Sequence, residues 1–171
     1  LVAGINFNIF HKHCQRVQMT NIAQTINVLQ AVILTEGEKM IKTPTYHVFD
    51  MYKVHQDADA VDLYIESEPY QFEDESIPQV TASASRNAED QLHISLCNLD
   101  PENAAEIDCD LRGMNAVKVG GTILTANAIN AHNTFDQPEN VKPQAFDEAE
   151  LKDNRLQVKL PPMSVVVLRV E

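Results

Sequence analysis

The stretch LQVKLPPMSVVVLRV, residues 156–170, decides the fold class of this chain. Apolar residues at 156, 158 and 160 alternate with polar ones at 157 and 159, which is the period of a strand with one buried face. After two prolines, the run SVVVLRV predicts a second strand that is buried. The end of the chain is therefore expected to be β-structure.

The same period of two begins near residue 60 and returns along the rest of the chain. It is carried by apolar residues at 63 and 65, at 80, 82 and 84, at 92, 94 and 96, and at 105, 107, 109 and 111. Short strands at regular spacing predict an antiparallel β-sandwich, jelly-roll-like, over residues 59–171. The acidic segment ESEPYQFEDES, residues 66–76, is expected to be a solvated loop. Gly120-Gly121 predicts either a hairpin turn or a bulge.

Residues 1–58 follow a helical period instead. LVAGINFNIFHKHC predicts an amphipathic helix with Val2, Ile5, Ile9 and His13 on one face. RVQMTNI predicts a short strand over residues 17–22, and AQTINVLQAVIL a buried segment. TPTYHVFDMYKVHQDA predicts a second helix, capped by Thr43 and opened by Pro44. One strand and two helices cannot close a core, so this half is expected to be a helix–strand–helix remnant of a (β/α)8 barrel. Because the chain opens at Leu1 inside an apolar pattern, we expect it to be cut from a longer protein.

Composition limits the partners of the chain. Its 25 acidic and 13 basic residues give a formal charge of −12, which disfavours nucleic acid and anionic membrane surfaces. No apolar run reaches the roughly 18 residues of a membrane helix. Three widely spaced cysteines without a CxxC pair exclude a disulfide framework. Carbohydrate or another protein remains as a partner, and no cofactor is predicted.

Four strings occur in order along the chain: NIAQTINVLQ, TPTYHVFDMYKVHQDA, AHNTF and PPMSVVVL. Together they resemble the C-terminal portion of the α-L-arabinofuranosidases of glycoside hydrolase family 51. The resemblance implies a catalytic barrel that ends within residues 1–58, followed by a β-sandwich. It also implies a retaining hydrolase of terminal α-L-arabinofuranosyl groups in arabinan or arabinoxylan, and a fragment that is structural. Such enzymes use two carboxyl groups, and the resemblance puts both glutamates upstream of Leu1, so no catalytic residue is assigned here.

The resemblance assigns one substrate contact. The family carries a glutamine in the matching AQ pair, which places Gln24 at the end of the predicted strand, where barrel enzymes hold their substrates. A carboxamide both donates to and accepts from hydroxyl groups. The alternative is a glutamine that stabilises the barrel rim, and Asn27 is a weaker second candidate.

Other tempting residues have simpler interpretations. His11, His13 and Cys14 suggest zinc, but a helix does not bring all three to one face. His47 and His55 are too far apart for a zinc pair on a helix, and we expect the helix that carries them to hold two domains together. Acidic pairs remain as candidates for an acid/base site or a calcium site, but polar surroundings favour solvated charge. They are Glu36 and Glu38, the run Glu73, Asp74 and Glu75, and the strand residues Glu106, Asp108 and Asp110.

Two other classes of function stay open. The first is a carbohydrate-binding module that would use Tyr64 or Tyr70, although the chain lacks the tryptophans such platforms favour. The second is a homo-oligomerisation domain.

Overall fold

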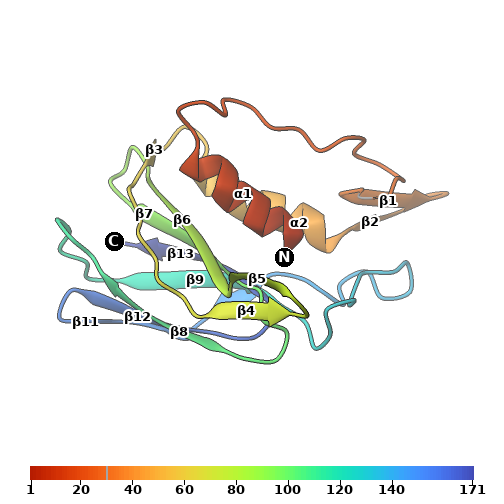
Figure 1. Ribbon diagram of the computed structural model, residues 1–171. Helices are drawn as coiled ribbons and strands as arrows, with labels where there is room; N and C mark the ends of the chain where they lie inside the picture. The colour runs from red at the N-terminus through yellow and green to blue at the C-terminus, as the bar shows by residue number, and fades with distance from the viewer. Residues whose placement is uncertain (30) are drawn as a thin grey trace.

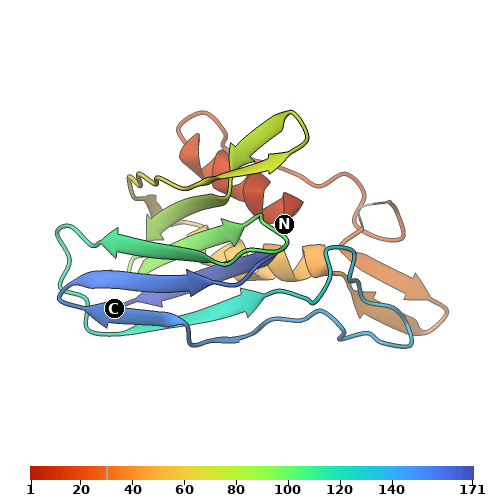
Figure 2. The ribbon, with the colours of Figure 1, turned by 60° about the horizontal axis from the view of Figure 1, so that its bottom comes forward.

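Three layers make up the molecule, which we describe from a computed structural model covering residues 1–29 and 31–171 (Figure 1). The middle layer is a six-stranded antiparallel sheet in the order β10-β9-β13-β7-β6-β3. Its strands are β3 (Asp59–Ala60), β6 (Val80–Arg86), β7 (Leu92–Asn98), β9 (Val119–Leu124), β10 (Gln144–Phe146) and β13 (Ser164–Val170). A three-stranded sheet, β11-β12-β8, packs on one face, and Figure 2 brings it forward. Its strands are β8 (Ala105–Asp110), β11 (Ala149–Lys152) and β12 (Arg155–Leu160). These sheets confirm the predicted antiparallel β-sandwich.

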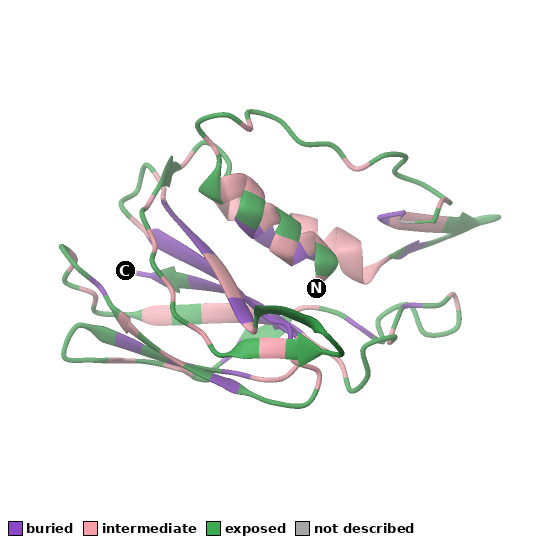
Figure 3. Cartoon of the chain, in the orientation of Figure 1, coloured by how far each residue is buried: buried purple, intermediate pink, exposed green. Residues whose placement is uncertain are grey.

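The main core lies between the two sheets. Along β12 the residues alternate strictly between exposed and buried, as the sequence predicts. Strand β13 is buried at six of its seven positions, since it has the second sheet on one side and the helices on the other. Leu156, Leu160 and Leu168 are almost completely excluded from solvent and join this core. Figure 3 shows the buried strands in the middle of the molecule.

A second core lies between the helices and the outer face of the six-stranded sheet. It is covered by α1 (Val2–Lys12), α2 (Pro44–Tyr52) and the short 3-10 helix η1 (Lys53–His55). Helix α2 begins as predicted, because the Thr43 hydroxyl accepts a hydrogen bond from the Tyr46 amide at 3.3 Å and Pro44 takes the first position. Its Val48, Met51 and Tyr52 side chains are buried. The stretch TPTYHVFDMYKVHQDA therefore holds the helical layer on the sheet.

The burial of α1 differs from the sequence prediction. Val2 is 73% exposed and Ile9 48% exposed, whereas Gly4 and Asn8 are buried. The reason is the sheet below: a Cβ added at Gly4 would lie 2.6 Å from the Cys97 sulfur, so only a glycine lets the helix come this close. Gly4 and Asn8 thus face the sandwich beside the partly buried Ile5 and Phe7, and part of the apolar side of α1 faces outward.

The predicted strand at residues 17–22 is wrong, because this segment has no regular secondary structure. A strand needs neighbours for its amide and carbonyl groups, and none lies beside this one in the described residues. The β-structure of this half is a hairpin of β1 (Ile33–Glu36) and β2 (Lys39–Lys42) instead. The hairpin projects away from the sandwich (Figures 1 and 2).

Two smaller expectations also change. The acidic segment is not a loop but a hairpin of β4 (Pro69–Phe72) and β5 (Glu75–Pro78), which is nonetheless largely exposed. Gly120 and Gly121 form neither a turn nor an assigned bulge; both lie within β9 and pair with β13. None of the helices in the described residues has the length and apolar character needed to cross a bilayer.

Candidate functional site

The predicted substrate residue, Gln24, lies in the irregular segment between α1 and β1. Its side chain is exposed, and its backbone adopts a left-handed conformation with φ 58°. That conformation is uncommon for residues other than glycine, asparagine and aspartate, and it turns the chain sharply at this point. The carboxamide is therefore presented at the surface.

Asn27 has a different role in this segment. Its Nδ2 donates to the Thr35 hydroxyl at 2.9 Å, and its Oδ1 accepts from the Thr35 amide at 2.7 Å. Both ends of the side chain thus bind strand β1. Asn27 fixes the segment that carries Gln24 to the hairpin.

Further hydrogen bonds anchor the hairpin to the rest of the chain. The Thr43 hydroxyl donates to the Ala31 carbonyl at 2.9 Å. Buried Asn133 donates to the carbonyls of Lys42 and Val141, each at 2.9 Å, and accepts from the Val141 amide at 2.7 Å. The bridge to Lys42 joins residues 91 positions apart.

A buried polar network lies under α1. The Tyr52 hydroxyl donates to Asn8 Oδ1 at 3.1 Å, and the Ser83 hydroxyl donates to the same oxygen at 2.8 Å. The Cys97 sulfur lies 3.4 Å from the Tyr52 oxygen. Burial raises the pKa of the Tyr52 phenol well above its usual value, and burial also raises the pKa of the Cys97 thiol. Both groups therefore stay protonated and serve as hydrogen-bonding partners.

Two histidines extend this network between the helices and the sheet. The rings of His11 and His55 lie 4.6 Å apart between centroids. His55 lies 2.7 Å from the hydroxyls of both Ser85 and Ser95, one at each ring nitrogen, and His11 Nδ1 lies 3.0 Å from the Ser83 hydroxyl. Burial, with a smaller contribution from His11 and His93, lowers the pKa of His55 to about 3. His55 is accordingly neutral at pH 7 and acts as a bridge from η1 to the sheet.

The other candidates from the sequence do not come together as a site. The described residues contain no group of three or more His, Cys, Asp or Glu side chains with metal-binding geometry. On the acidic strand β8, Asp108 pairs with Arg155 and Asp110 with Arg112, each at 2.9 Å. These carboxylates bind arginines rather than converging on a cation.

Exposed aromatic residues do occur on the sandwich. Tyr64 is 86% exposed and Phe72 65% exposed, while Tyr70 is half-buried. The Tyr64 hydroxyl donates to Glu66 at 2.9 Å. These three aromatic side chains are the candidates for contact between the sandwich itself and a sugar.

The protein-family model for the α-L-arabinofuranosidase C-terminal domain matches residues 1–164. The chain belongs to this family. Among curated relatives of this C-terminal domain, the intracellular exo-α-L-arabinofuranosidase of Bacteroides ovatus is 43% identical over 171 residues. That match covers 99% of the chain but 33% of the relative, so the chain spans about a third of that protein.

In solved structures, too, nearly the whole chain matches about a third of a longer protein. The GH51 arabinofuranosidase of Xanthomonas axonopodis pv. citri superposes with a TM-score of 0.97 at 44% identity, over 99% of this chain and 34% of that one. The α-L-arabinofuranosidase of Thermotoga maritima, solved as an arabinose complex, superposes with a TM-score of 0.87 at 26% identity, over 99% and 37%. The helical segment is included in both matches, together with the sandwich.

Proposed function

We propose that this chain is the C-terminal part of an α-L-arabinofuranosidase that removes terminal α-L-arabinofuranosyl groups from arabinan or arabinoxylan with retention of configuration. The observation that carries the proposal is the match of nearly the whole chain to one third of an arabinofuranosidase, at 43% identity. Retaining glycosidases need two carboxyl groups about 5 Å apart. These would be supplied by the part of the protein upstream of this chain.

The role of the chain itself would be structural. In this proposal residues 1–58 complete the catalytic barrel and residues 59–171 form the sandwich that braces it. The exposed apolar residues of the first part support this division, since they need a partner surface. They are Val2, Ile9, Met19, Ile26, Leu29 and Met40.

Gln24 is proposed to contact the bound sugar. Its exposed carboxamide and the hydrogen-bonded segment that fixes it support the proposal, because a contact residue must be held in place. The test is Gln24→Gly in the longer protein, since glycine keeps the left-handed backbone and removes the whole side chain with its carboxamide. We expect kcat/KM on an aryl α-L-arabinofuranoside to fall by about tenfold to a hundredfold, the usual loss for one hydrogen bond to substrate. Gln15→Gly is the control for the general effect of replacing an exposed glutamine by glycine. If both variants are equally active, Gln24 does not contact the sugar.

The proposed division of labour has its own test. The purified 171-residue chain should show no hydrolysis of an aryl arabinofuranoside, while the longer protein should hydrolyse it. Measurable turnover by the 171-residue chain would refute the structural role.

The exposure of Tyr64 and Phe72 favours a second candidate function, a carbohydrate-binding module. Titration with arabino-oligosaccharides decides this point. Saturable binding that is lost in Tyr64→Ala would support a carbohydrate-binding module. If no saturable binding is seen, the structural role is the only one supported.

A further inference from the structure

A groove opens where the helical layer ends on the six-stranded sheet. One wall is α2 and η1, and the floor is formed by β9, β13 and β7. It has a volume of about 460 Å³, which is within the range of pockets that hold small ligands. Its lining includes Asp50, Lys53, His93, Gly120, Thr122 and Arg169.

Gly120 leaves the floor of this groove bare. A Cβ added at Gly120 would have no atom within 4 Å, whereas one at neighbouring Gly121 would lie 2.7 Å from Leu168. Packing thus explains Gly121 but not Gly120. A glycine inside a strand costs stability and often marks a bulge, a bend or a place where a ligand or another backbone comes close. Gly120 pairs in regular register with Arg169, which favours the approach of a ligand.

His93 is an unsatisfied polar side chain at this groove. It is only 6% exposed, and its Nδ1 has no hydrogen-bond partner among the residues that the structure describes. A buried polar group without a partner costs about 1–3 kcal/mol. A ligand in the groove that reorients this ring and binds it would recover that loss.

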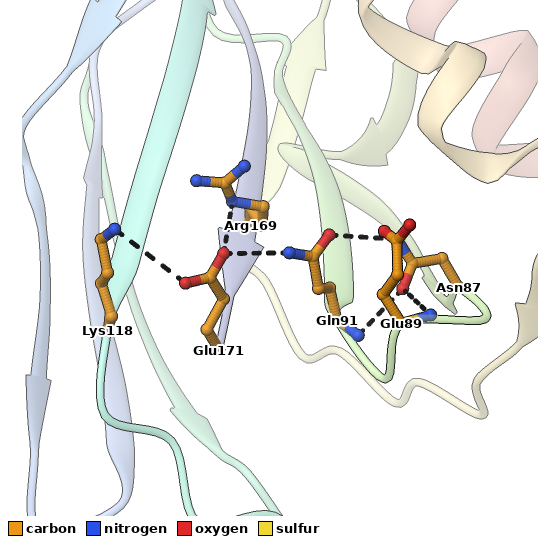
Figure 4. A network of polar contacts seen from close by, with 6 residues as sticks. All are labelled: Asn87, Glu89, Gln91, Lys118, Arg169 and Glu171. Carbon is orange, nitrogen blue, oxygen red and sulfur yellow. Dashed lines mark hydrogen bonds and ion pairs between the residues drawn. The ribbon is translucent and has the colours of Figure 1, made fainter.

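Arg169 lies beside His93 as its cross-strand neighbour and opposite Gly120. Its Nε forms an ion pair with a Glu171 carboxylate oxygen 3.0 Å away, and Glu171 accepts a hydrogen bond from Gln91 at 3.0 Å (Figure 4). Figure 4 shows the two terminal nitrogens of Arg169 pointing away from Glu171. The network therefore holds the guanidinium through one nitrogen and leaves its terminal pair of donors for another partner.

We propose that this groove binds a carboxylate carried on a polyhydroxylated ring, a sugar acid, with the terminal nitrogens of Arg169 as its anchor. A planar guanidinium and a carboxylate form two parallel hydrogen bonds, which a compact ammonium cannot match. Asp50 and Thr122 line the same groove and supply an acceptor and a hydroxyl for the ring. Lys53, 2.8 Å from Asp50, keeps the wall from carrying a net negative charge that would repel the ligand.

The test is an NMR titration of the 19.1 kDa chain with glucuronate, glucose and inorganic phosphate, following the backbone amide signals. Glucose matches glucuronate in size but carries a hydroxymethyl group in place of the carboxylate. We expect saturable shifts at Gly120, Thr122 and Arg169 with glucuronate, at a Kd on the order of 1 mM, and at least about tenfold weaker binding of glucose and phosphate.

Two variants separate the anchor from the floor. Arg169→Lys keeps the charge but removes the two-nitrogen fork, and should weaken glucuronate about tenfold. Gly120→Leu fills the open floor and should abolish binding while the other amide signals keep the wild-type pattern. Arg112→Lys, at an exposed arginine of the other face, is the matched control and should bind as the wild type does.

The proposal is overturned if glucuronate gives no saturable shifts in the groove, or if glucose or phosphate binds as tightly as glucuronate. It is also overturned if Gly120→Leu and Arg169→Lys both bind like the wild type. These outcomes do not depend on arabinofuranosidase activity, which the titration does not measure.

Discussion

The His55 bridge makes the stability of this chain depend on pH. Burial lowers the pKa of His55 to about 3, against about 6.5 in an unfolded chain, so on acidification the unfolded state takes up the proton first. The contribution of His55 is therefore complete above about pH 6.5 and is lost as the pH falls from there toward 3. Between pH 7.5 and pH 5.0, linkage gives a loss of about 2 kcal/mol in the free energy of unfolding.

This loss can be assigned by substitution. Glutamine at position 55 can still donate to and accept from the two serine hydroxyls but does not titrate. His55→Gln should therefore reduce the difference in the free energy of unfolding between pH 7.5 and pH 5.0 by about 2 kcal/mol. The measurement is urea unfolding followed by circular dichroism at pH 7.5 and 5.0, with His132→Gln as an exposed control. His11 and His93 face His55, and burial lowers the pKa of each, so part of the pH dependence should persist in His55→Gln. If His55→Gln and the wild type lose equal stability on acidification, the bridge does not act as described.

Three further predictions concern packing and are checked by urea unfolding. Gly4→Ala should destabilise the chain by about 1–3 kcal/mol, because the new methyl group would lie 2.6 Å from the Cys97 sulfur; an unchanged midpoint would show that α1 does not sit this close. Leu168→Ala should cost about 2–5 kcal/mol because its side chain is fully buried, whereas Val117→Ala, at a residue 86% exposed, should stay within about 0.5 kcal/mol; equal losses would contradict the described core. Asn133→Ala should cost about 1–3 kcal/mol and expose the β1–β2 hairpin to faster amide exchange, since it removes the hydrogen bond to Lys42 of the hairpin and the two to Val141 that hold Asn133 in place. Unchanged exchange in β2 would refute that anchor.

Much of the fold follows from local patterns in the sequence. The alternation in β12 predicts its strand and its buried face, because one side of that sheet is exposed to solvent. Thr43 and Pro44 predict the start of α2, because capping is a local interaction. The segment at residues 61–65 shows the limit of such patterns: its apolar side chains face the core as expected, yet it has no assigned strand. Alternation predicts which side is buried, not which backbone partner is present.

The site is harder to predict, because it depends on residues far apart in the sequence. The face that α1 buries is set by Gly4 and by the polar side chains below it, so the spacing of its apolar residues is misleading. The bridge from His55 joins strands 30 and 40 residues away. One signal was available: the serines at 83, 85 and 95 occupy strand positions that share a face with His93, which indicates a polar layer on that side of the sheet.

The close contact between α1 and the sheet has a practical consequence for Cys97. Its thiol has no exposed surface while α1 is in place, so a thiol-alkylating reagent can reach it only when the helix leaves the sheet. In a background where the half-buried Cys14 and Cys109 are serine, the rate of labelling would measure how often the helix detaches. The labelling rate of Cys97 thus reports how often the helical layer opens, and it needs no enzymatic assay.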